Sequence, residues 1–149
     1  MKKRVVYVNG NFVDEDKAKV SVFDRGFLFA DAVYEVTAVI DGKILEWDGH
    51  VKRLERSLKE LDMKFPISET ELLDIHFDLI KKNTLKEGLI YLQVTRGEDD
   101  RSFDYPDESV KPTLVLFTQV KSLAESNIAK TGLKVISVPD MRWGRRDIK

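Results

Sequence analysis

DAVYEVTAVIDGKILEW, residues 31–47, is the stretch that decides the fold, and DGHVKRLERSLKELDMK, residues 48–64, follows it directly. In the first stretch a β-branched run passes through Asp41-Gly42 into a second apolar run, which is a strong signal of a β-hairpin. The apolar residues of the second stretch recur at steps of three and four: Val51, Leu54, Leu58 and Leu61. This change of period predicts an amphipathic helix, with Asp48 as its N-terminal cap.

The same two patterns occur on either side of this stretch. Asn9-Gly10 separates two short apolar runs in RVVYVNGNFV, residues 4–13, and predicts another hairpin. A second helical pattern occurs in residues 68–83, SETELLDIHFDLIKKN. Ser68 and Glu71, three residues apart, form a capping box at its start, and an apolar stripe of helical period follows. A second helix is therefore predicted there.

Two further strands are predicted after the second helix, in GLIYLQVTRG (residues 88–97) and KPTLVLFTQV (residues 111–120). The charged loop EDDRSFDYPDES, residues 98–109, lies between them. Strands, two grouped helices and strands again are the order of an α+β domain, for which we expect the bounds 1–120.

The rest of the sequence predicts a linker and the beginning of a second domain. KSLAESNIAKTG, residues 121–132, is polar and has no core pattern, which is typical of a linker. LKVISVP, residues 133–139, is expected to be the first strand of the second domain. We expect residues 133–149 to be only the start of that domain, so that the sequence is a fragment of a longer protein.

Composition and charge are those of an ordinary globular protein. The 149 residues are 42% hydrophobic and 34% charged, with a formal net charge of -1 and no cysteine. Such a chain is a poor partner for nucleic acid or for an anionic membrane. The lack of cysteine excludes disulfides, thiol catalysis and thiolate metal sites, and it fits the cytoplasm. The apolar run Val5–Val8 is too short for a signal peptide or a membrane span.

Several residues have both a structural and a functional interpretation. His50 and Arg53 lie three apart on one face of the predicted helix, where they form either a solvated basic face or a phosphate site. His76 lies beside an apolar stripe and is expected to be a packed or surface histidine rather than a ligand. Tyr34 and Glu35 are neighbours in a predicted strand, so they point to opposite faces of the sheet.

The charged loop and the C-terminal end offer two more alternatives. Arg101 is surrounded by Asp and Glu residues, and it either balances their charge or binds a carboxylate. DMRWGRRDIK, residues 140–149, is either a basic tail or the site of an imine-forming lysine, Lys149. The sequence contains no glycine-rich phosphate loop, no metal-ligand spacing and no nucleophile elbow.

Four motifs occur in one order: DRGFLFADAVYEV (24–36), HVKRL (50–54), YLQVTRG (91–97) and RWGRRDIK (142–149). With these motifs the sequence closely resembles the N-terminal half of the D-amino-acid aminotransferases. That family consists of fold type IV enzymes that use pyridoxal 5'-phosphate (PLP) and are relatives of the branched-chain aminotransferases. The resemblance implies the small N-terminal α+β domain of that fold, followed by the first strand and the lysine segment of a truncated second domain.

The resemblance also implies roles for four residues. Lys149 matches the lysine that forms a Schiff base with PLP and moves the proton between the substrate Cα and the cofactor. Arg53 matches the arginine that binds the PLP phosphate, and Tyr34 matches a tyrosine beside the cofactor and the substrate carboxylate. Arg101 matches the loop arginine that binds the substrate α-carboxylate. In the family this loop enters the active site of the neighbouring subunit, which implies a homodimer.

The sequence departs from the family in two ways. Phe103 stands where the D-amino-acid enzymes carry a histidine two residues after the loop arginine, and phenylalanine offers no hydrogen bond to a carboxylate. We expect this loss to weaken carboxylate recognition by about 1–2 kcal/mol. Family members are also longer, and the additional part supplies the acidic residue that faces the pyridine nitrogen.

The function implied by the resemblance is ping-pong transamination between a D-amino acid, such as D-alanine, and a 2-oxo acid. AVYEVTAV, residues 32–39, is closer to the D-amino-acid members than to the branched-chain members. An (R)-selective amine transaminase, favoured by Phe103, is the first alternative, and an enzyme similar to aminodeoxychorismate lyase is the second. A non-catalytic dimerisation domain is the alternative from another class.

Overall fold

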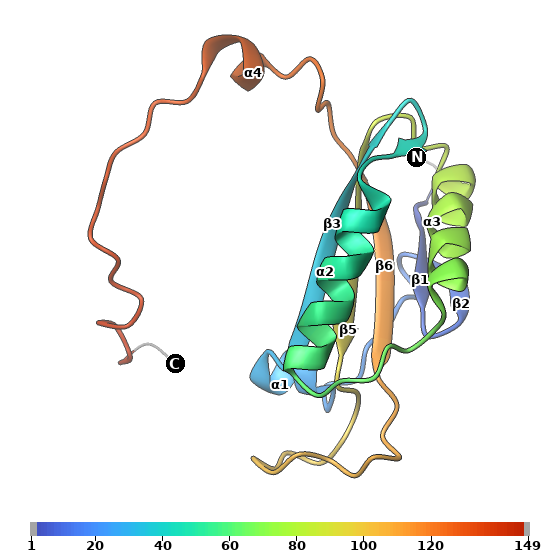
Figure 1. Cartoon of the computed structure of the whole chain (residues 1–149), viewed down its shortest axis with the longest axis vertical. Coiled ribbons are helices and arrows are strands. Elements are labelled where there is room, and N and C mark those ends of the chain that lie inside the picture. The colour runs from blue at the N-terminus through green and yellow to red at the C-terminus, as the bar shows by residue number, and fades with distance from the viewer. Residues whose placement is uncertain (1–2, 148–149) are drawn as a thin grey trace.

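The computed structural model describes residues 3–147 as an antiparallel six-stranded sheet with two long helices on one face (Figure 1). The strand order is β2-β1-β6-β5-β3-β4. The strands are β1 (Val5–Val8), β2 (Asn11–Asp14), β3 (Ala32–Ile40), β4 (Lys43–Ile44), β5 (Gly88–Thr95) and β6 (Thr113–Val120). The helices are α1 (Arg25–Phe29), α2 (Trp47–Glu60), α3 (Glu69–Asn83) and α4 (Asn127–Thr131). α2 packs on β3, and α3 packs on β1 and β6, so the predicted α+β class is confirmed.

Both predicted hairpins are present, and their turns have the backbone that Asn-Gly and Asp-Gly pairs favour. φ is positive at Asn9 (46°) and Gly10 (91°), and again at Asp41 (51°) and Gly42 (71°). Two left-handed residues in succession give a turn whose twist matches that of the flanking strands. The second hairpin is short, because β4 pairs only with the last residues of β3. Residues 32–38 therefore form a free edge, with no strand on their outer side within the described part of the chain.

The core lies between the sheet and the two long helices. Its most deeply buried apolar side chains come from both layers: Val39, Leu54, Leu58, Leu72, Leu79, Ile90, Leu92, Val94 and Leu116. Each fully buried leucine or isoleucine contributes about 1.5–3 kcal/mol, so this layer fixes α2 over β3. His76 is buried in the same layer with its ring centroid 4.9 Å from that of Trp47, so of the two structural roles expected for it the packed one holds.

One of the two predicted helix caps is confirmed and the other was wrong. Ser68 and Glu71 form the capping box at the start of α3. At α2 the N-cap is Glu46, with φ of 52° and no side-chain hydrogen bond, and Asp48 lies in the first turn. The chain passes from β4 into α2 through this left-handed residue, so Asp48 comes too late to cap the helix. Its charge still lies where the helix dipole favours an anion.

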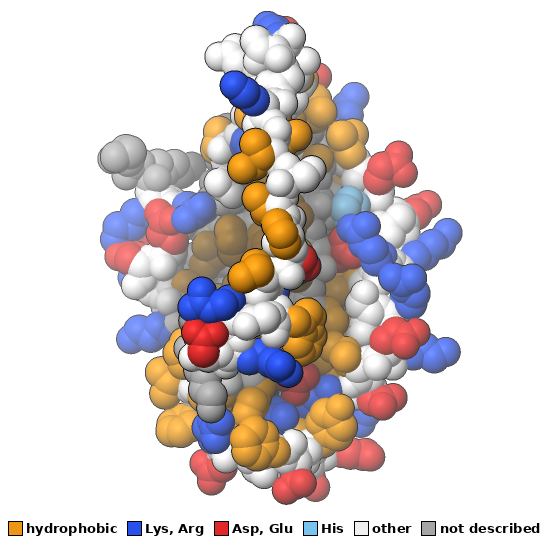
Figure 2. Space-filling model, turned by 90° about the vertical axis from the view of Figure 1, so that its left-hand side faces the viewer, with side chains coloured by type: hydrophobic (Ala, Val, Ile, Leu, Met, Phe, Trp, Pro, Cys, Tyr) orange, Lys and Arg blue, Asp and Glu red, His pale blue; other side chains and the backbone are white. Residues whose placement is uncertain are grey.

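The segment that follows β6 stands away from the sheet (Figure 1), and Figure 2, in which it lies toward the viewer, shows apolar side chains along it. The predicted linker, residues 121–132, contains the short helix α4. The strand predicted at residues 133–139 was wrong, because that segment is irregular and all its side chains are exposed. An extended segment becomes a strand only when a neighbour satisfies its backbone groups, and no strand lies beside it within residues 3–147. The division of the chain into two domains stays a prediction.

Candidate functional site

Strand β3 sends two candidate residues to opposite faces of the sheet, as their alternation predicts. Glu35 is 5% exposed and contacts His50 and Arg53 of α2, whereas Tyr34, its neighbour along the strand, is 65% exposed and lies on the other face. The two long helices leave that face uncovered (Figure 1). We call the uncovered side the open face. Both residues belong to the free edge of the sheet, so a ligand bound along that edge can contact side chains from both faces.

Glu35 joins the two basic residues of α2. Its Oε1 accepts a hydrogen bond from Arg53 Nε and its Oε2 accepts one from Arg53 Nη2, both at 2.6 Å. Glu35 Oε2 also lies 2.7 Å from His50 Nδ1. Burial by itself raises the pKa of Glu35, but the hydrogen bonds from Arg53 and His50 outweigh it and hold the pKa below its ordinary value. Glu35 is therefore a carboxylate that fixes the plane of the Arg53 guanidinium.

One nitrogen of the Arg53 guanidinium, Nη1, is not used by the contact with Glu35. The Arg53 side chain is 59% exposed, and Nη1 makes no hydrogen bond to any residue that the structure describes. An arginine bound to a carboxylate on its inner side offers an oriented donor to an anion on its outer side. A freely solvated basic face thus does not describe His50 and Arg53, and the role in phosphate binding stays a prediction.

Tyr34 belongs to a row of aromatic rings on the open face. Its ring stacks on that of Tyr91 of β5 with centroids 5.7 Å apart, and Tyr91 stacks on Phe117 of β6 at 4.9 Å. The guanidinium of Arg4 lies over Phe117, 5.7 Å from the ring centroid. Stacking holds the Tyr34 ring in place although much of its surface is exposed.

Arg101 lies in the exposed loop between β5 and β6. Within the described residues it forms no ion pair with the acidic side chains around it. Its guanidinium lies 5.2 Å from the ring centroid of Phe29 and 5.2 Å from that of Phe103. The two rings are 5.8 Å apart. The structure therefore places Arg101 beside two aromatic rings, and its role in carboxylate binding stays a prediction.

Sequence reasoning missed a partly buried group of charges below this loop. Asp31 Oδ2 accepts hydrogen bonds from Arg25 Nε at 3.0 Å and from Arg96 Nε at 2.7 Å. Burial raises the pKa of Asp31, but the hydrogen bonds from Arg96 and Arg25 outweigh it and leave the pKa below its ordinary value. The sequence signal that could have indicated this group is the DRGFLFADAVYEV motif, which contains Arg25 and Asp31. Nothing local joins either of them to Arg96, which follows β5.

The C-terminal end is described up to residue 147, so the predicted catalytic residue Lys149 lies outside the described residues. Arg142 and Arg145 pair locally, with Asp140 at 2.6 Å and with Asp147 at 2.9 Å. No contact within residues 3–147 brings this end to the free edge of β3. Of the predicted site residues, the structure therefore places Tyr34 and Arg53 beside one edge and Arg101 in a separate loop.

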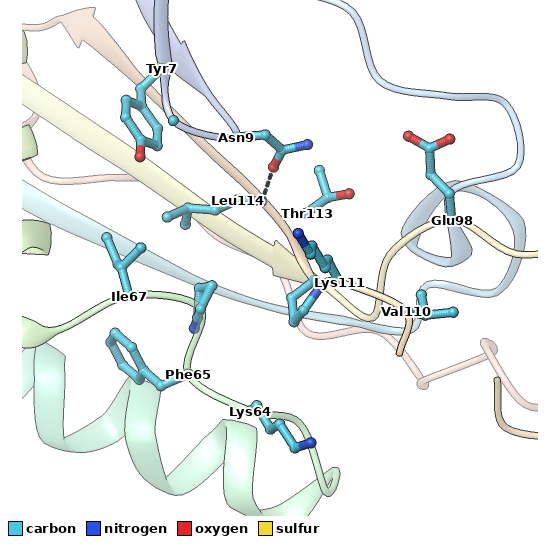
Figure 3. A pocket seen from close by; sticks show the side chains of 13 residues that line it. Tyr7, Asn9, Lys64, Phe65, Ile67, Glu98, Val110, Lys111, Thr113 and Leu114 are labelled. Carbon is cyan, nitrogen blue, oxygen red and sulfur yellow. Dashed lines mark hydrogen bonds between the residues drawn. The ribbon is translucent and has the colours of Figure 1, made fainter. Parts of the chain in front are cut away.

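A pocket of about 770 Å³ lies between the turn that joins β1 to β2, the start of β6 and the connection from α2 to α3 (Figure 3). Apolar side chains and two lysines contribute to its lining: Tyr7, Phe65, Ile67, Leu114, Lys64 and Lys111. No predicted site residue lines it. Within residues 3–147 there is also no group of side chains suited to a metal ion, and none of the helices combines the length and apolar character of a membrane span.

The sequence is similar to that of known enzymes along nearly its whole length. The model of the family described as amino-transferase class IV matches residues 32–149. Over 144 residues the chain is 36% identical to D-alanine aminotransferase of Staphylococcus haemolyticus, and this region covers 97% of the chain and 51% of that enzyme. The chain thus spans about half the length of the curated relatives it matches.

Two solved structures show the same fold. The T.th. branched-chain amino acid aminotransferase with pyridoxamine 5'-phosphate has a TM-score of 0.75 and 21% identity, covering 85% of this chain and 43% of that one. The 4-amino-4-deoxychorismate lyase of Pseudomonas aeruginosa has a TM-score of 0.63 and 29% identity, covering 78% of this chain and 40% of that one. The predicted fold, the small N-terminal domain of the fold type IV enzymes, is thereby confirmed.

Proposed function

Because the chain belongs to the class IV aminotransferase family, we propose that the protein carrying it is a PLP-dependent aminotransferase. It passes an amino group between a D-amino acid, such as D-alanine, and a 2-oxo acid in a ping-pong cycle. The similarity to D-alanine aminotransferases supports the choice of substrate. The structural observation that carries the proposal is Arg53, which Glu35 holds beside the free edge of β3 while Nη1 makes no hydrogen bond within residues 3–147.

The residues along the free edge suit PLP. The phosphate of PLP is an anion, and an oriented guanidinium nitrogen is a donor that such an anion favours. Arg53 would supply this contact, and Tyr34 would contact the cofactor and the substrate carboxylate. When bound, PLP supplies an aldehyde that takes the amino group and a ring that withdraws electrons from the substrate Cα.

Two further residues complete the proposed site. Lys149 Nζ would hold the cofactor covalently and would be the base that takes the proton from the substrate Cα. A primary amine suits both tasks, because it condenses reversibly with an aldehyde and becomes a free base once it is displaced. Arg101 binds the substrate α-carboxylate in the active site of the neighbouring subunit of a homodimer. We further propose that the enzyme works in the cytoplasm.

The proposed domain organisation follows from the same assignment. Residues 1–120 form the small domain, residues 121–132 form the linker, and residues 133–149 begin the PLP-binding domain. This division puts Lys149 on the second domain and Arg53 on the first. Both domains would then contribute residues to the cofactor, Arg53 from the first and Lys149 from the second.

An absorbance spectrum of the purified protein tests the proposal. With PLP we expect a band near the visible edge that D-alanine removes, that 2-oxoglutarate restores and that L-alanine leaves in place. Lys149→Ala abolishes this band, whereas the matched control Lys134→Ala, at an exposed lysine of the same segment, retains it. A colourless protein that responds to neither PLP nor D-alanine contradicts the proposal and leaves a non-catalytic dimerisation domain.

Phe103 favours a second candidate, an (R)-selective amine transaminase. The exposed Phe103 ring presents an apolar surface beside Arg101, where a histidine would offer a hydrogen bond. This candidate predicts turnover of amines that lack a carboxylate, with little dependence on Arg101. The similarity to a 4-amino-4-deoxychorismate lyase supports a third, which is recognised by pyruvate release without an acceptor oxo acid.

A further inference from the structure

Two arginines from distant parts of the sequence share one partly buried carboxylate below the loop between β5 and β6. Arg25 lies in α1, Asp31 directly precedes β3, and Arg96 directly follows β5. The side chains of Arg25, Asp31 and Arg96 are 5%, 12% and 12% exposed. We call these three residues the arginine clamp. Because both arginines bind the same oxygen of Asp31, displacing one of them disturbs the other.

Arg25 extends the clamp to the backbone of the loop. Its Nη1 donates to the carbonyl oxygen of Ser102 at 3.0 Å and to that of Asp104 at 3.2 Å. These two residues flank Phe103, and Ser102 directly follows Arg101. A single guanidinium therefore holds the chain on both sides of Phe103. Hydrogen bonds from a charged donor are among the stronger ones in proteins.

Arg96 holds the later part of the loop. Its Nη2 donates to the carbonyl oxygen of Leu61 at 2.8 Å, and its guanidinium lies 4.5 Å from the ring centroid of Tyr105. Cavities of about 250 and 770 Å³ lie against residues 105–112, and Figure 3 shows the larger one. Most residues of 98–110 are exposed, so the contacts of Arg25 and Arg96 are a large part of what holds the loop.

The residues on either side of Arg25 hold α1 against the end of β5, where Arg25 reaches Asp31. Asp24 is fully buried and accepts hydrogen bonds from Gly26 N at 2.8 Å and from Thr95 Oγ1 at 2.9 Å. The backbone N–H of Arg25 donates to the carbonyl oxygen of Gly97 at 2.8 Å. A Cβ at Gly26 would lie 2.5 Å from Thr95 Cγ2, so the approach of α1 to β5 requires glycine. The Asp-Arg-Gly triplet thus fastens α1 to the end of β5.

We propose that the arginine clamp positions Arg101 and Phe103 for substrate recognition. The clamp fixes the backbone from Ser102 to Asp104, and this sets the direction in which Arg101 leaves the loop. Arg25 is a positioning residue, because it acts on the substrate only through the loop. The role in recognition rests on the function proposed above, whereas the control of the loop by the clamp does not.

Hydrogen–deuterium exchange of Arg25→Lys tests the control of the loop. Lysine keeps the charge, but its compact ammonium cannot join Asp31 to two carbonyl groups at once. We expect the amides of residues 98–110 to exchange about tenfold faster, which corresponds to the loss of one or two hydrogen bonds, while those of β5 are unchanged. Arg4→Lys is the matched control, since Arg4 also binds a carboxylate, that of Glu15, and a carbonyl, that of Thr118, at the other end of β6. It should leave the loop unchanged.

Steady-state kinetics of the holoenzyme test the role in recognition. We expect Arg25→Lys to raise KM for D-alanine about tenfold with little change in kcat, and to change turnover of an amine without a carboxylate less than about twofold. If Arg25→Lys does not fold, Tyr105→Leu is the second variant. It replaces an exposed ring, removes the contact of that ring with Arg96, and should also make the amides of residues 98–110 exchange faster. Unchanged exchange in the loop overturns the clamp. Faster exchange with equal losses for both substrates overturns its role in recognition. A wild-type protein without transaminase activity contradicts the proposed function. The exchange experiment then still tests whether the clamp holds the loop.

Discussion

Glu35 binds Arg53 through both carboxylate oxygens, with Arg53 Nε and Nη2 each at 2.6 Å. The pair links a strand to the helix that covers it, and it connects a buried carboxylate to an exposed guanidinium. Glu35 therefore orients the Arg53 guanidinium without any ligand. A change at Glu35 should act both on stability and on the binding of an anion by Arg53.

Glu35→Gln should lower the free energy of unfolding by about 1–3 kcal/mol, because it removes a buried charge that three hydrogen-bond donors surround. Urea denaturation at pH 7 measures this loss. In the same variant we expect PLP affinity, measured by absorbance titration, to fall about tenfold as Arg53 loses its fixed plane. Glu55→Gln is the control, at an exposed glutamate of α2, and should change stability by less than about 0.5 kcal/mol. Equal effects of the two variants would contradict the importance of the pair.

Acid should weaken the fold through two carboxylates. The pKa values of Glu35 and Asp31 are both lowered in the folded state, so the unfolded chain binds protons more tightly than the folded one. Their contribution to stability is complete at neutral pH and is lost as pH falls below about 4.5, through the folded-state pKa values. Urea denaturation from pH 7 to pH 3 should show this loss in the wild type. A smaller decrease below pH 4.5 is expected for Glu35→Gln, and an identical pH profile would exclude Glu35 as a source.

His76 should cause a separate loss of stability at higher pH. Burial in the core lowers the pKa of His76 to about 4, although its hydrogen bond to the Leu72 carbonyl opposes the shift. The unfolded chain protonates this histidine near pH 6.5, so stability falls between pH 6.5 and 4 by about 3 kcal/mol. His76→Phe keeps an aromatic ring beside Trp47 and should remove this decrease. An imidazole NMR resonance of His76 that titrates above pH 6 would contradict the prediction.

Local sequence signals were sufficient for much of the fold. The Asn9-Gly10 and Asp41-Gly42 turns follow from the positive φ that these residue types tolerate. Helix α3 follows from its capping box and its period. The strand predicted at residues 133–139 failed because a β-branched run specifies a strand only when a neighbouring strand is present, and none lies beside it in the described part of the chain.

The candidate site depended more on contacts between distant residues. Alternation along β3 predicted that Glu35 points away from Tyr34, but it does not show that Arg53 lies above Glu35. The arginine clamp was not predicted for the same reason, since Arg25 and Arg96 bind the same carboxylate only once α1 packs against the end of β5. The resemblance to a family supplied candidate roles for single residues. It did not supply the carboxylates that hold those residues.

Two glycines should respond to alanine with opposite signs. A Cβ at Gly26 would meet Thr95 Cγ2 at 2.5 Å, whereas Gly49 of α2 has no atom within 4 Å of the corresponding position. Gly26→Ala should therefore lower the free energy of unfolding by about 1–3 kcal/mol through overpacking. Gly49→Ala should raise it by about 0.5 kcal/mol, because alanine favours the helix. Urea denaturation of both variants provides the comparison, and a neutral Gly26→Ala would show that α1 moves away from β5 without cost.

Phe103→His should shift the enzyme toward substrates that carry a carboxylate. Phe103 lies in the same loop as Arg101, 5.2 Å from its guanidinium, and the clamp holds the backbone on both sides of it. A histidine there adds a hydrogen-bond donor for the α-carboxylate at a position that is already fixed, so little ordering entropy opposes the gain. We expect kcat/KM for D-alanine to rise about tenfold, which corresponds to one added hydrogen bond of about 1.4 kcal/mol. Phe103→Leu is the control, because it removes the ring without adding a donor. If both substitutions change kcat/KM equally, the effect comes from lost aromatic contacts with Phe29 and Arg101, and Phe103 does not decide recognition of the carboxylate.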